Sequence, residues 1–296
     1  MKVLVTGVKG QLGYDCYEEL TQHGIDAVGV DIEDMDITKE ESVYQVLNQI
    51  KPTHIIHCAA WTAVDAAEDK ENKDMVHTVN GLGTKYLANW CKDNSSPLMY
   101  ISTDYVFSGQ GTTPWEADCK DFAPLNVYGE SKLSGETYVS SILNEFFIVR
   151  IAWVFGTNGN NFIKTMLNVG KNRKELSIVN DQIGTPTYTY DLAKLLVSMI
   201  QTKEYGYYHA TNEGGYISWY DFAVEIFQQA TLLGHTEYSQ EELKVHPVST
   251  KEYGVSKAAR PYNSRLDKRK LVDKGFLPLP TWQDALARYL KELTLM

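Results

Sequence analysis

The chain has 296 residues and a formal net charge of −10. A chain this acidic is not expected to bind nucleic acid or a membrane surface, since both partners need a basic face. Its length allows one large domain or two smaller ones. We find no secretory leader or membrane-spanning apolar stretch in it, and therefore expect a cytoplasmic protein without a membrane partner.

The first half of the chain alternates short apolar runs with helical periods, a pattern typical of a parallel sheet covered by helices on both faces. We therefore predict a Rossmann-like, doubly wound α/β fold and assign residues 1–151 to a dinucleotide-binding domain. A capping box, Thr38-Lys39-Glu40-Glu41, is predicted to open the second helix. The predicted strands cover residues 2–6, 26–31, 54–60, 98–102 and 146–151, and the other predicted helices cover residues 11–23, 76–93 and about 128–141.

The second half, residues 152–296, has a looser rhythm and carries most of the predicted loops. A helix is predicted near residues 162–170 and a loop at 181–187. Capping boxes that start at Ser218 and Thr281 are predicted to open two late helices. Because loops often carry substrate contacts, we assign this half mainly to a smaller, loop-rich substrate-binding region, with some segments returning to the first domain.

Three glycines, Gly7, Gly10 and Gly13, follow the first predicted strand with GxxGxxG spacing. Glycine at such positions lets the backbone turn tightly and approach a pyrophosphate at the positive end of a helix. Asp31, at the end of the second strand, could accept a hydrogen bond from the adenosine ribose or could be an ordinary turn residue. Lys9 could instead pair with a 2'-phosphate, so the sequence leaves open whether the cofactor is NADH or NADPH.

Tyr128 and Lys132 lie four residues apart on a predicted helix, which places the phenol and the ammonium on one face. The cation is expected to lower the pKa of the phenol toward the range useful for proton transfer. Just upstream, the predicted buried strand at residues 98–102 delivers Thr103 to the edge where open α/β sheets bind their ligands. The pair is therefore a candidate catalytic dyad.

Two other tyrosine–lysine pairs have the same spacing, Tyr190 with Lys194 and Tyr253 with Lys257. Spacing alone therefore does not identify the dyad. Tyr253 is predicted to lie in a loop, with too little chain after it to complete a cofactor-binding sheet. Lys194 is predicted to face water from an apolar helix.

The cysteines and histidines do not indicate a metal site. The four cysteines are widely spaced without a CxxC motif, which fits reduced thiols rather than a disulfide frame or a zinc site. His54 and His57 flank Ile55-Ile56 on a predicted strand, and their odd separation points them to opposite faces.

At these residues the chain resembles the extended short-chain dehydrogenase/reductases, and within them the dTDP-4-dehydrorhamnose reductase family. The resemblance runs from Met1 to about Leu290. The motifs that carry it are TGVKGQLG (6–13), CAAWTAVDAAE (58–68), STDYVF (102–107), PLNVYGESKLSGE (124–136), GNNFIKTML (159–167), NDQIGTPT (180–187) and RPYNSRL (260–266).

The resemblance implies NAD(P)H-dependent reduction of dTDP-6-deoxy-L-lyxo-4-hexulose to dTDP-L-rhamnose, and by analogy a homodimer. Tyr128 would give a proton to the C4'' ketone oxygen, Thr103 would hydrogen-bond the same oxygen, and Lys132 would hold the nicotinamide ribose. The implied cofactor contacts, beside the glycines and the dyad, are Gln11, Leu12, Asp31, Asp36, Ile37, Ala60, Trp61 and Thr62. The implied substrate contacts are Thr103, Asp104, Trp153, Asn161, Arg260 and Ser264.

Alternatives remain at several of these positions. Trp153 could equally be a core residue, and Arg260 a surface arginine rather than a planar fork for the diphosphate. Trp61 stands where relatives often carry histidine, which leaves cofactor preference open. For the whole protein, the alternatives are a non-catalytic NAD(P)-binding regulatory subunit and another sugar-nucleotide reductase or epimerase. Retention of Thr103 and of both members of the dyad argues against the regulatory subunit.

Overall fold

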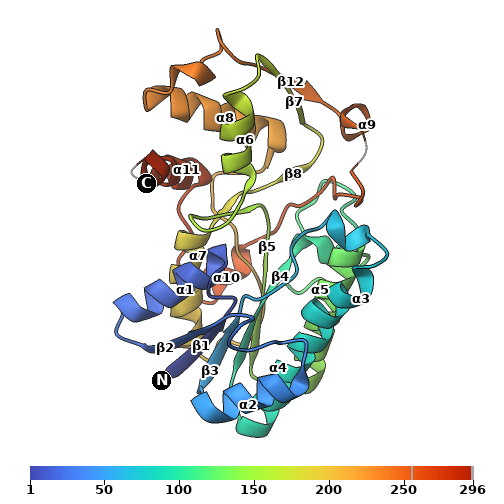
Figure 1. The fold of residues 1–296 in the computed structure, drawn as a ribbon, viewed down its shortest axis with the longest axis vertical. Coiled ribbons are helices and arrows are strands. Elements are labelled where there is room, and N and C mark those ends of the chain that lie inside the picture. The colour runs from blue at the N-terminus through green and yellow to red at the C-terminus, as the bar shows by residue number, and fades with distance from the viewer. Residues whose placement is uncertain (255, 295–296) are drawn as a thin grey trace.

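The computed structural model describes residues 1–254 and 256–294. Its centre is a six-stranded sheet with the strand order β10-β5-β4-β3-β1-β2, and every pairing in it is parallel (Figure 1). The strands are β1 (Lys2–Thr6), β2 (Asp26–Val30), β3 (His54–His57), β4 (Leu98–Thr103), β5 (Phe146–Ile151) and β10 (Gly206–His209). The predicted doubly wound parallel α/β fold is confirmed.

Helices cover both faces of this sheet because successive side chains of each strand point to opposite faces. On one face, Val3 and Val5 pack in a core with α1 (Gln11–Gln22) and α7 (Thr189–Ile200). On the other, Leu4 packs in a core with α2 (Glu40–Ile50), α4 (Gly83–Asn94) and α5 (Val127–Ile142). Figure 1 shows the two layers on either side of the strands.

A second core lies beyond the carboxyl ends of the strands. It is formed by α6 (Phe162–Gly170), α8 (Trp219–Leu232) and α11 (Trp282–Thr294), together with the parallel pair β7 (Glu175–Val179) and β12 (Lys244–Val248). The later half also returns to the sheet, since β10 pairs with β5 and α10 (Arg269–Asp273) packs near β10. The short elements of this half are β6 (Val154–Phe155), β8 (Ile183–Gly184), β9 (Thr187–Tyr188), β11 (Ile217–Ser218), η4 (Thr236–Tyr238) and α9 (Thr250–Tyr253).

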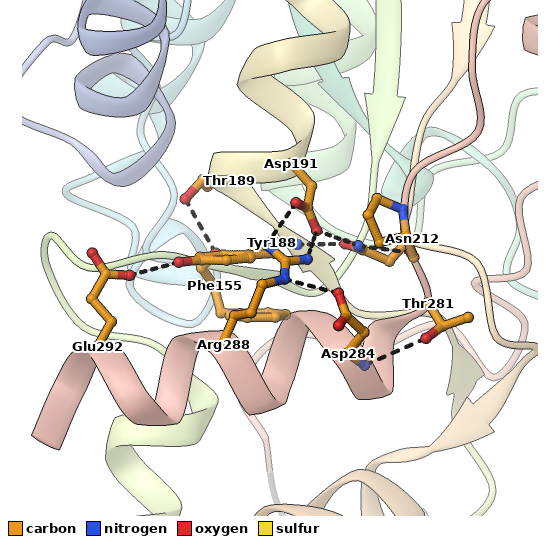
Figure 2. A network of polar contacts seen from close by, with 10 residues as sticks. Phe155, Tyr188, Thr189, Asp191, Asn212, Thr281, Asp284, Arg288 and Glu292 are labelled. Carbon is orange, nitrogen blue, oxygen red and sulfur yellow. Dashed lines mark hydrogen bonds and ion pairs between the residues drawn. The ribbon is translucent and has the colours of Figure 1, made fainter.

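Polar contacts tie the second core to the helices on the sheet (Figure 2). Arg288 of α11 forms two hydrogen bonds with Asp191 of α7, at 2.9 and 2.7 Å. Asn212 donates to the same carboxylate at 2.8 Å, and Tyr188 donates to Glu292 of α11 at 2.6 Å. Because α7 packs on α1, the last helix is linked to the helix that follows the glycine loop.

The local predictions met different outcomes. The strand at 146–151, the helix at 162–170 and the capping box at Ser218 are confirmed. The capping box at Thr38 is wrong: the cap of α2 is Lys39, because the Thr38 hydroxyl donates instead to Asp36 Oδ1 at 2.6 Å. The predicted loop at 181–187 holds Gly184 of β8 and Thr187 of β9, each in a two-residue strand.

The predicted helix at 76–93 is part of a longer run of three helical segments. It begins with α3 (Lys73–His77), passes through one π-helical turn, η2 (Thr78–Leu82), and continues as α4. A π turn inside an α-helix often marks a functional site. Within the described residues, none of the helices is long and apolar enough to cross a bilayer.

Candidate active site

A cavity of about 670 Å³ opens at the carboxyl ends of the central strands. This is the edge at which open α/β sheets bind their ligands. Its walls come from the glycine loop after β1, the segments after β2 and β3, the end of β4, the start of α5 and the segment after β5. The predicted site residues that line it are Gly7, Gly10, Gln11, Leu12, Gly13, Asp31, Asp36, Ile37, Ala60, Thr62, Thr103, Asp104, Tyr128, Lys132 and Trp153.

Two glycines of the loop, Gly7 and Gly13, have no room for a side chain. Gly7 has a φ of 66°, in the left-handed region that favours glycine, and an added Cβ there would lie 2.8 Å from the backbone of Ala59. An added Cβ at Gly13 would overlap the carbonyl oxygen of Gly7. The loop is therefore a bare backbone cradle at the amino end of α1. Such a cradle fits the pyrophosphate of a dinucleotide, which is drawn to the positive end of a helix.

Asp31 lies directly after β2, as predicted, and its carboxylate is held by backbone groups. Its Oδ2 accepts from the backbone N–H of Lys9 at 2.9 Å and its Oδ1 from that of Ile32 at 2.9 Å. A carboxylate oxygen has two acceptor positions, so each oxygen can still accept a ribose hydroxyl. The residues present therefore fit the adenosine end of a nicotinamide dinucleotide.

The three predicted catalytic residues come together at the other end of the cavity. Thr103 is the last residue of β4, and its side chain lies beside the Tyr128 phenol. Tyr128 and Lys132 lie one turn apart on α5, which Asn126 caps by accepting from the backbone N–H of Gly129 at 2.8 Å. Both side chains line the cavity. The geometry thus joins a hydroxyl, a phenol and an amine in the cavity that holds the glycine cradle.

The predicted effect of Lys132 on Tyr128 is wrong in this arrangement. Burial raises the pKa of Tyr128 well above its ordinary value, and the lowering contributed by Thr103 is smaller. The Lys132 ammonium instead donates to the carbonyl of Ile101 at 2.7 Å and lies 4.0 Å from the centre of the Tyr100 ring. Burial lowers the pKa of Lys132 to about 7. Tyr128 therefore keeps its proton near neutral pH.

Sequence reasoning missed Asn80, which lies in the π turn and is 1% exposed. Its side chain accepts from the backbone N–H of Trp61 at 2.8 Å and donates to the hydroxyl of Ser131 at 2.9 Å. Asn80 thus connects the segment after β3 to the helix that carries the dyad. The available signal was a polar residue directly before two closely spaced glycines, Gly81 and Gly83, within an otherwise helical run.

Asp104 is a buried carboxylate that faces the cavity. It is 2% exposed and its Oδ1 accepts from the Thr103 hydroxyl at 3.1 Å, while its Oδ2 has no hydrogen-bond partner among the described residues. Burial raises the pKa of Asp104 to about 6 from an ordinary value of 3.8. A buried acceptor without a partner costs stability unless something else satisfies it.

Asp104 should make stability depend on pH. Because its folded pKa is raised, the folded state binds the proton more tightly, so stability is full below about pH 4 and falls as pH rises through about 6. Asp104→Asn removes this penalty and is expected to stabilise the protein more at pH 8 than at pH 4, with an upper bound on the order of 3 kcal/mol. Urea unfolding at both pH values measures the difference, and an equal effect at both would contradict the prediction.

Trp153 lies at the cavity wall in a strained conformation. Its φ is 51°, in the left-handed region, which is uncommon for a bulky residue and costs energy that the surroundings must offset. Its ring stacks on Trp219 with the ring centres 3.7 Å apart, and an added Cβ at Gly184 would collide with it. Packing from the second core therefore fixes Trp153 where it lines the cavity.

Four predicted site residues lie outside the lining. The indole N–H of Trp61 donates to Ala63 O at 3.2 Å, and Ser264 lies beside the Asp104 carboxylate. Asn161 caps α6 and donates to Gln11 at 3.1 Å and to Tyr289 at 2.8 Å.

Arg260, the fourth of these residues, stands one layer behind the cavity wall. It donates to the Tyr105 hydroxyl at 3.1 Å and to Asp65 at 2.7 Å. Tyr105 lines the cavity and its ring packs edge-on against that of Tyr128. Arg260 is thus an ion-paired residue in contact with the lining rather than a free surface arginine.

The competing tyrosine–lysine pairs lie at the surface, whereas His57 is buried. Lys194 is exposed, with its ammonium 4.1 Å from the centre of the Tyr190 ring. Tyr253 is 60% exposed and ends the one-turn helix α9 rather than lying in a loop. His57 is buried between the hydroxyls of Thr6 and Thr84. The part of the chain that the structure describes contains no cluster of potential metal ligands.

Comparison with known proteins gives one consistent family. The family model described as RmlD substrate binding domain matches residues 1–295. The dTDP-4-dehydrorhamnose reductase of Aggregatibacter actinomycetemcomitans is 37% identical over 96% of this chain and 97% of that protein. The spore coat polysaccharide biosynthesis protein SpsK of Bacillus subtilis is 36% identical over 98% of this chain and 97% of that protein.

Among solved structures, the chain is similar to dTDP-4-dehydrorhamnose reductase from Bacillus anthracis in complex with NADP. The sequences are 41% identical, the TM-score is 0.90, and the match covers 99% of this chain and 100% of that chain. The similarity therefore extends through both cores and the cavity between them.

Proposed function

The chain belongs to the RmlD substrate binding domain family, and from this premise we propose that it is an NAD(P)H-dependent dTDP-4-dehydrorhamnose reductase. The reaction is reduction of dTDP-6-deoxy-L-lyxo-4-hexulose to dTDP-L-rhamnose. The observation that carries the proposal is the meeting of Thr103, Tyr128 and Lys132 in the cavity that also holds the glycine cradle. Relatives of the same length carry this activity in their names.

In the proposed mechanism, Tyr128 is the proton donor. When held by the glycine cradle and Asp31, the reduced nicotinamide dinucleotide would supply hydride to C4'' of the sugar, which would leave the carbonyl electron pair on the oxygen. The Tyr128 phenol then gives its proton to that oxygen, which leaves a phenolate and a neutral alcohol. The raised pKa of Tyr128 ensures that the proton is present at neutral pH before the step.

Thr103 and Lys132 would assist this transfer. The Thr103 hydroxyl would turn from Asp104 Oδ1 to donate to the ketone oxygen as negative charge develops there, which stabilises the transition state more than the ground state. Lys132 would leave the Ile101 carbonyl to hold the nicotinamide ribose, and its ammonium would then favour the phenolate left on Tyr128. Gln11, Leu12, Asp36, Ile37, Ala60 and Thr62 would complete the cofactor walls, with Trp61 behind them.

The sugar nucleotide would occupy the side of the cavity nearer the second core. Asp104 belongs to the lining of this cavity, and Trp153 offers a rigid aromatic wall. Arg260 would reach the diphosphate by exchanging its Asp65 partner, while Asn161 and Ser264 would support the wall from behind.

We further propose that the protein forms a homodimer and is located in the cytoplasm. Light scattering of the purified protein would check the dimer, and cell fractionation would check the location.

A direct assay tests the proposed function. Purified protein is mixed with the 4-keto sugar nucleotide and with NADH or NADPH in turn, and loss of the reduced-nicotinamide absorbance is followed. The expected product, dTDP-L-rhamnose, is identified by NMR. Cofactor binding without turnover would instead support the alternative of a non-catalytic regulatory subunit, and a product with another configuration at C4'' would indicate a different sugar-nucleotide reductase.

A further inference from the structure

We propose that Glu33 biases cofactor choice in this protein toward NADH: it holds the ammonium of Lys9 and thereby disfavours a dinucleotide with a phosphate on its adenosine 2'-hydroxyl. This inference rests on the proposed function, because it concerns the cofactor of that same site. Lys9 and Glu33 are chain neighbours of Gly10 and Ile32, which line the cavity at its adenosine end.

The backbone of Lys9 is fixed at the end of β2. The N–H of Val8 donates to Val30 O at 3.3 Å, and the side chain of Val8 occupies the space over Gly29 that a Cβ would need. The N–H of Lys9 then donates to Asp31 Oδ2 at 2.9 Å. Only the side chain of Lys9 is free to change partner, and it lies 2.9 Å from Glu33 Oε2.

The surroundings of this pair are strongly acidic. Asp31 and Glu33 both lie within hydrogen-bond distance of Lys9, and Asp34 accepts from the backbone N–H of Asp31 at 3.0 Å. The Glu33 hydrogen bond, together with the negative charges of Asp31 and Asp34, raises the pKa of the Lys9 ammonium. A ribose with free hydroxyls can donate to Asp31, whereas a 2'-phosphate at that position would be repelled unless Lys9 turned to meet it.

The ion pair with Glu33 competes with any pairing between the Lys9 ammonium and a 2'-phosphate. The Lys9 and Glu33 side chains are each 63% exposed, and exposed ion pairs exchange partners at little cost. Lys9 can therefore reach a 2'-phosphate, but doing so leaves Glu33 unpaired beside a doubly charged group. With NADH the ion pair stays intact. The pair should thus bias binding toward NADH by a modest factor while still permitting NADPH.

The experiment compares dissociation constants of NADH and NADPH, measured by fluorescence titration without any sugar substrate. The two ligands differ only in the 2'-phosphate. Glu33→Gln is expected to tighten NADPH binding by about 3- to 10-fold and to leave NADH binding within about 2-fold. Asp34→Asn is the matched control, because it removes one negative charge from the same segment without releasing Lys9, and its effect on NADPH should be smaller.

A double variant identifies the group that meets the phosphate. Lys9→Gln added to Glu33→Gln should abolish the gain in NADPH affinity, because the released ammonium is then missing. Equal gains from Glu33→Gln and Asp34→Asn, or a gain that survives Lys9→Gln, would overturn the proposal in favour of a general charge effect. If the unmodified protein bound neither nucleotide, the proposed function would fail as well. This outcome differs from failure of the Glu33 proposal alone, in which both nucleotides still bind.

Discussion

Tyr128→Phe is expected to lower kcat for ketone reduction by about 10²- to 10⁴-fold, the usual contribution of a positioned proton donor. The alkoxide left by hydride transfer would then have to take its proton from elsewhere. The substitution keeps the ring, whose edge-on contact with Tyr105 has ring centres 5.5 Å apart, so the fold and the cofactor affinity should change little. Steady-state kinetics with circular dichroism and NADPH titration measure these quantities separately.

Tyr190→Phe is the matched control for this substitution. Tyr190 has the same four-residue spacing to a lysine, yet it is exposed on α7. The Tyr190→Phe variant should reduce the ketone with the same kcat as the unmodified protein. If Tyr128→Phe reduced the ketone at an undiminished rate, Tyr128 could not be the proton donor and the mechanism would need another acid.

Arg150→Met is expected to have the largest effect on stability, a loss of about 3–5 kcal/mol in the free energy of unfolding. Arg150 is fully buried and pairs with Glu136 through Nε at 2.8 Å and Nη2 at 2.7 Å. Glu136 also accepts from the Ser102 hydroxyl at 2.5 Å. Removing the guanidinium leaves a carboxylate that is 1% exposed without its counter-charge. Urea denaturation followed by circular dichroism measures the loss.

Two further variants test the cause of this loss. Arg269→Met removes a guanidinium whose side chain is 76% exposed in its ion pairs with Asp267 and Glu116, and it should change stability little. Adding Glu136→Gln to Arg150→Met removes the uncompensated charge and should restore part of the lost stability. If the double variant were less stable than Arg150→Met alone, the loss would come from packing rather than charge.

Local sequence signals predicted the elements that depend on local physics. The family resemblance read from the motifs is confirmed by the match over residues 1–295. The glycine cradle and the strand that ends in Thr103 followed from periodicity and from the backbone needs of glycine. The Thr38 capping box failed because Asp36, two residues earlier, competes for the same hydroxyl, and the pattern of a capping box does not include such a competitor.

The sequence could not predict the polar contacts under the site, because these depend on the register of the strands across the sheet. Ser102 pairs with Arg150, and Arg150 with His209, so three polar side chains from β4, β5 and β10 form one row under the site. These three residues are far apart in the sequence, so the row can be recognised only when the order and register of the strands are known. The direction of the Lys132 ammonium likewise depends on the Ile101 carbonyl beneath it, and helix spacing carries no information about that group.

The position of β10 has a consequence for how the protein is made. The outer strand of the sheet, Gly206–His209, is synthesised long after its neighbour Phe146–Ile151. Until it emerges from the ribosome, the Arg150 guanidinium lacks the His209 ring, which lies 3.3 Å away in the finished protein. Until then β5 lacks its partner strand at this edge of the sheet. A chain released before residue 209 would therefore expose the unpaired backbone groups of β5 to other chains.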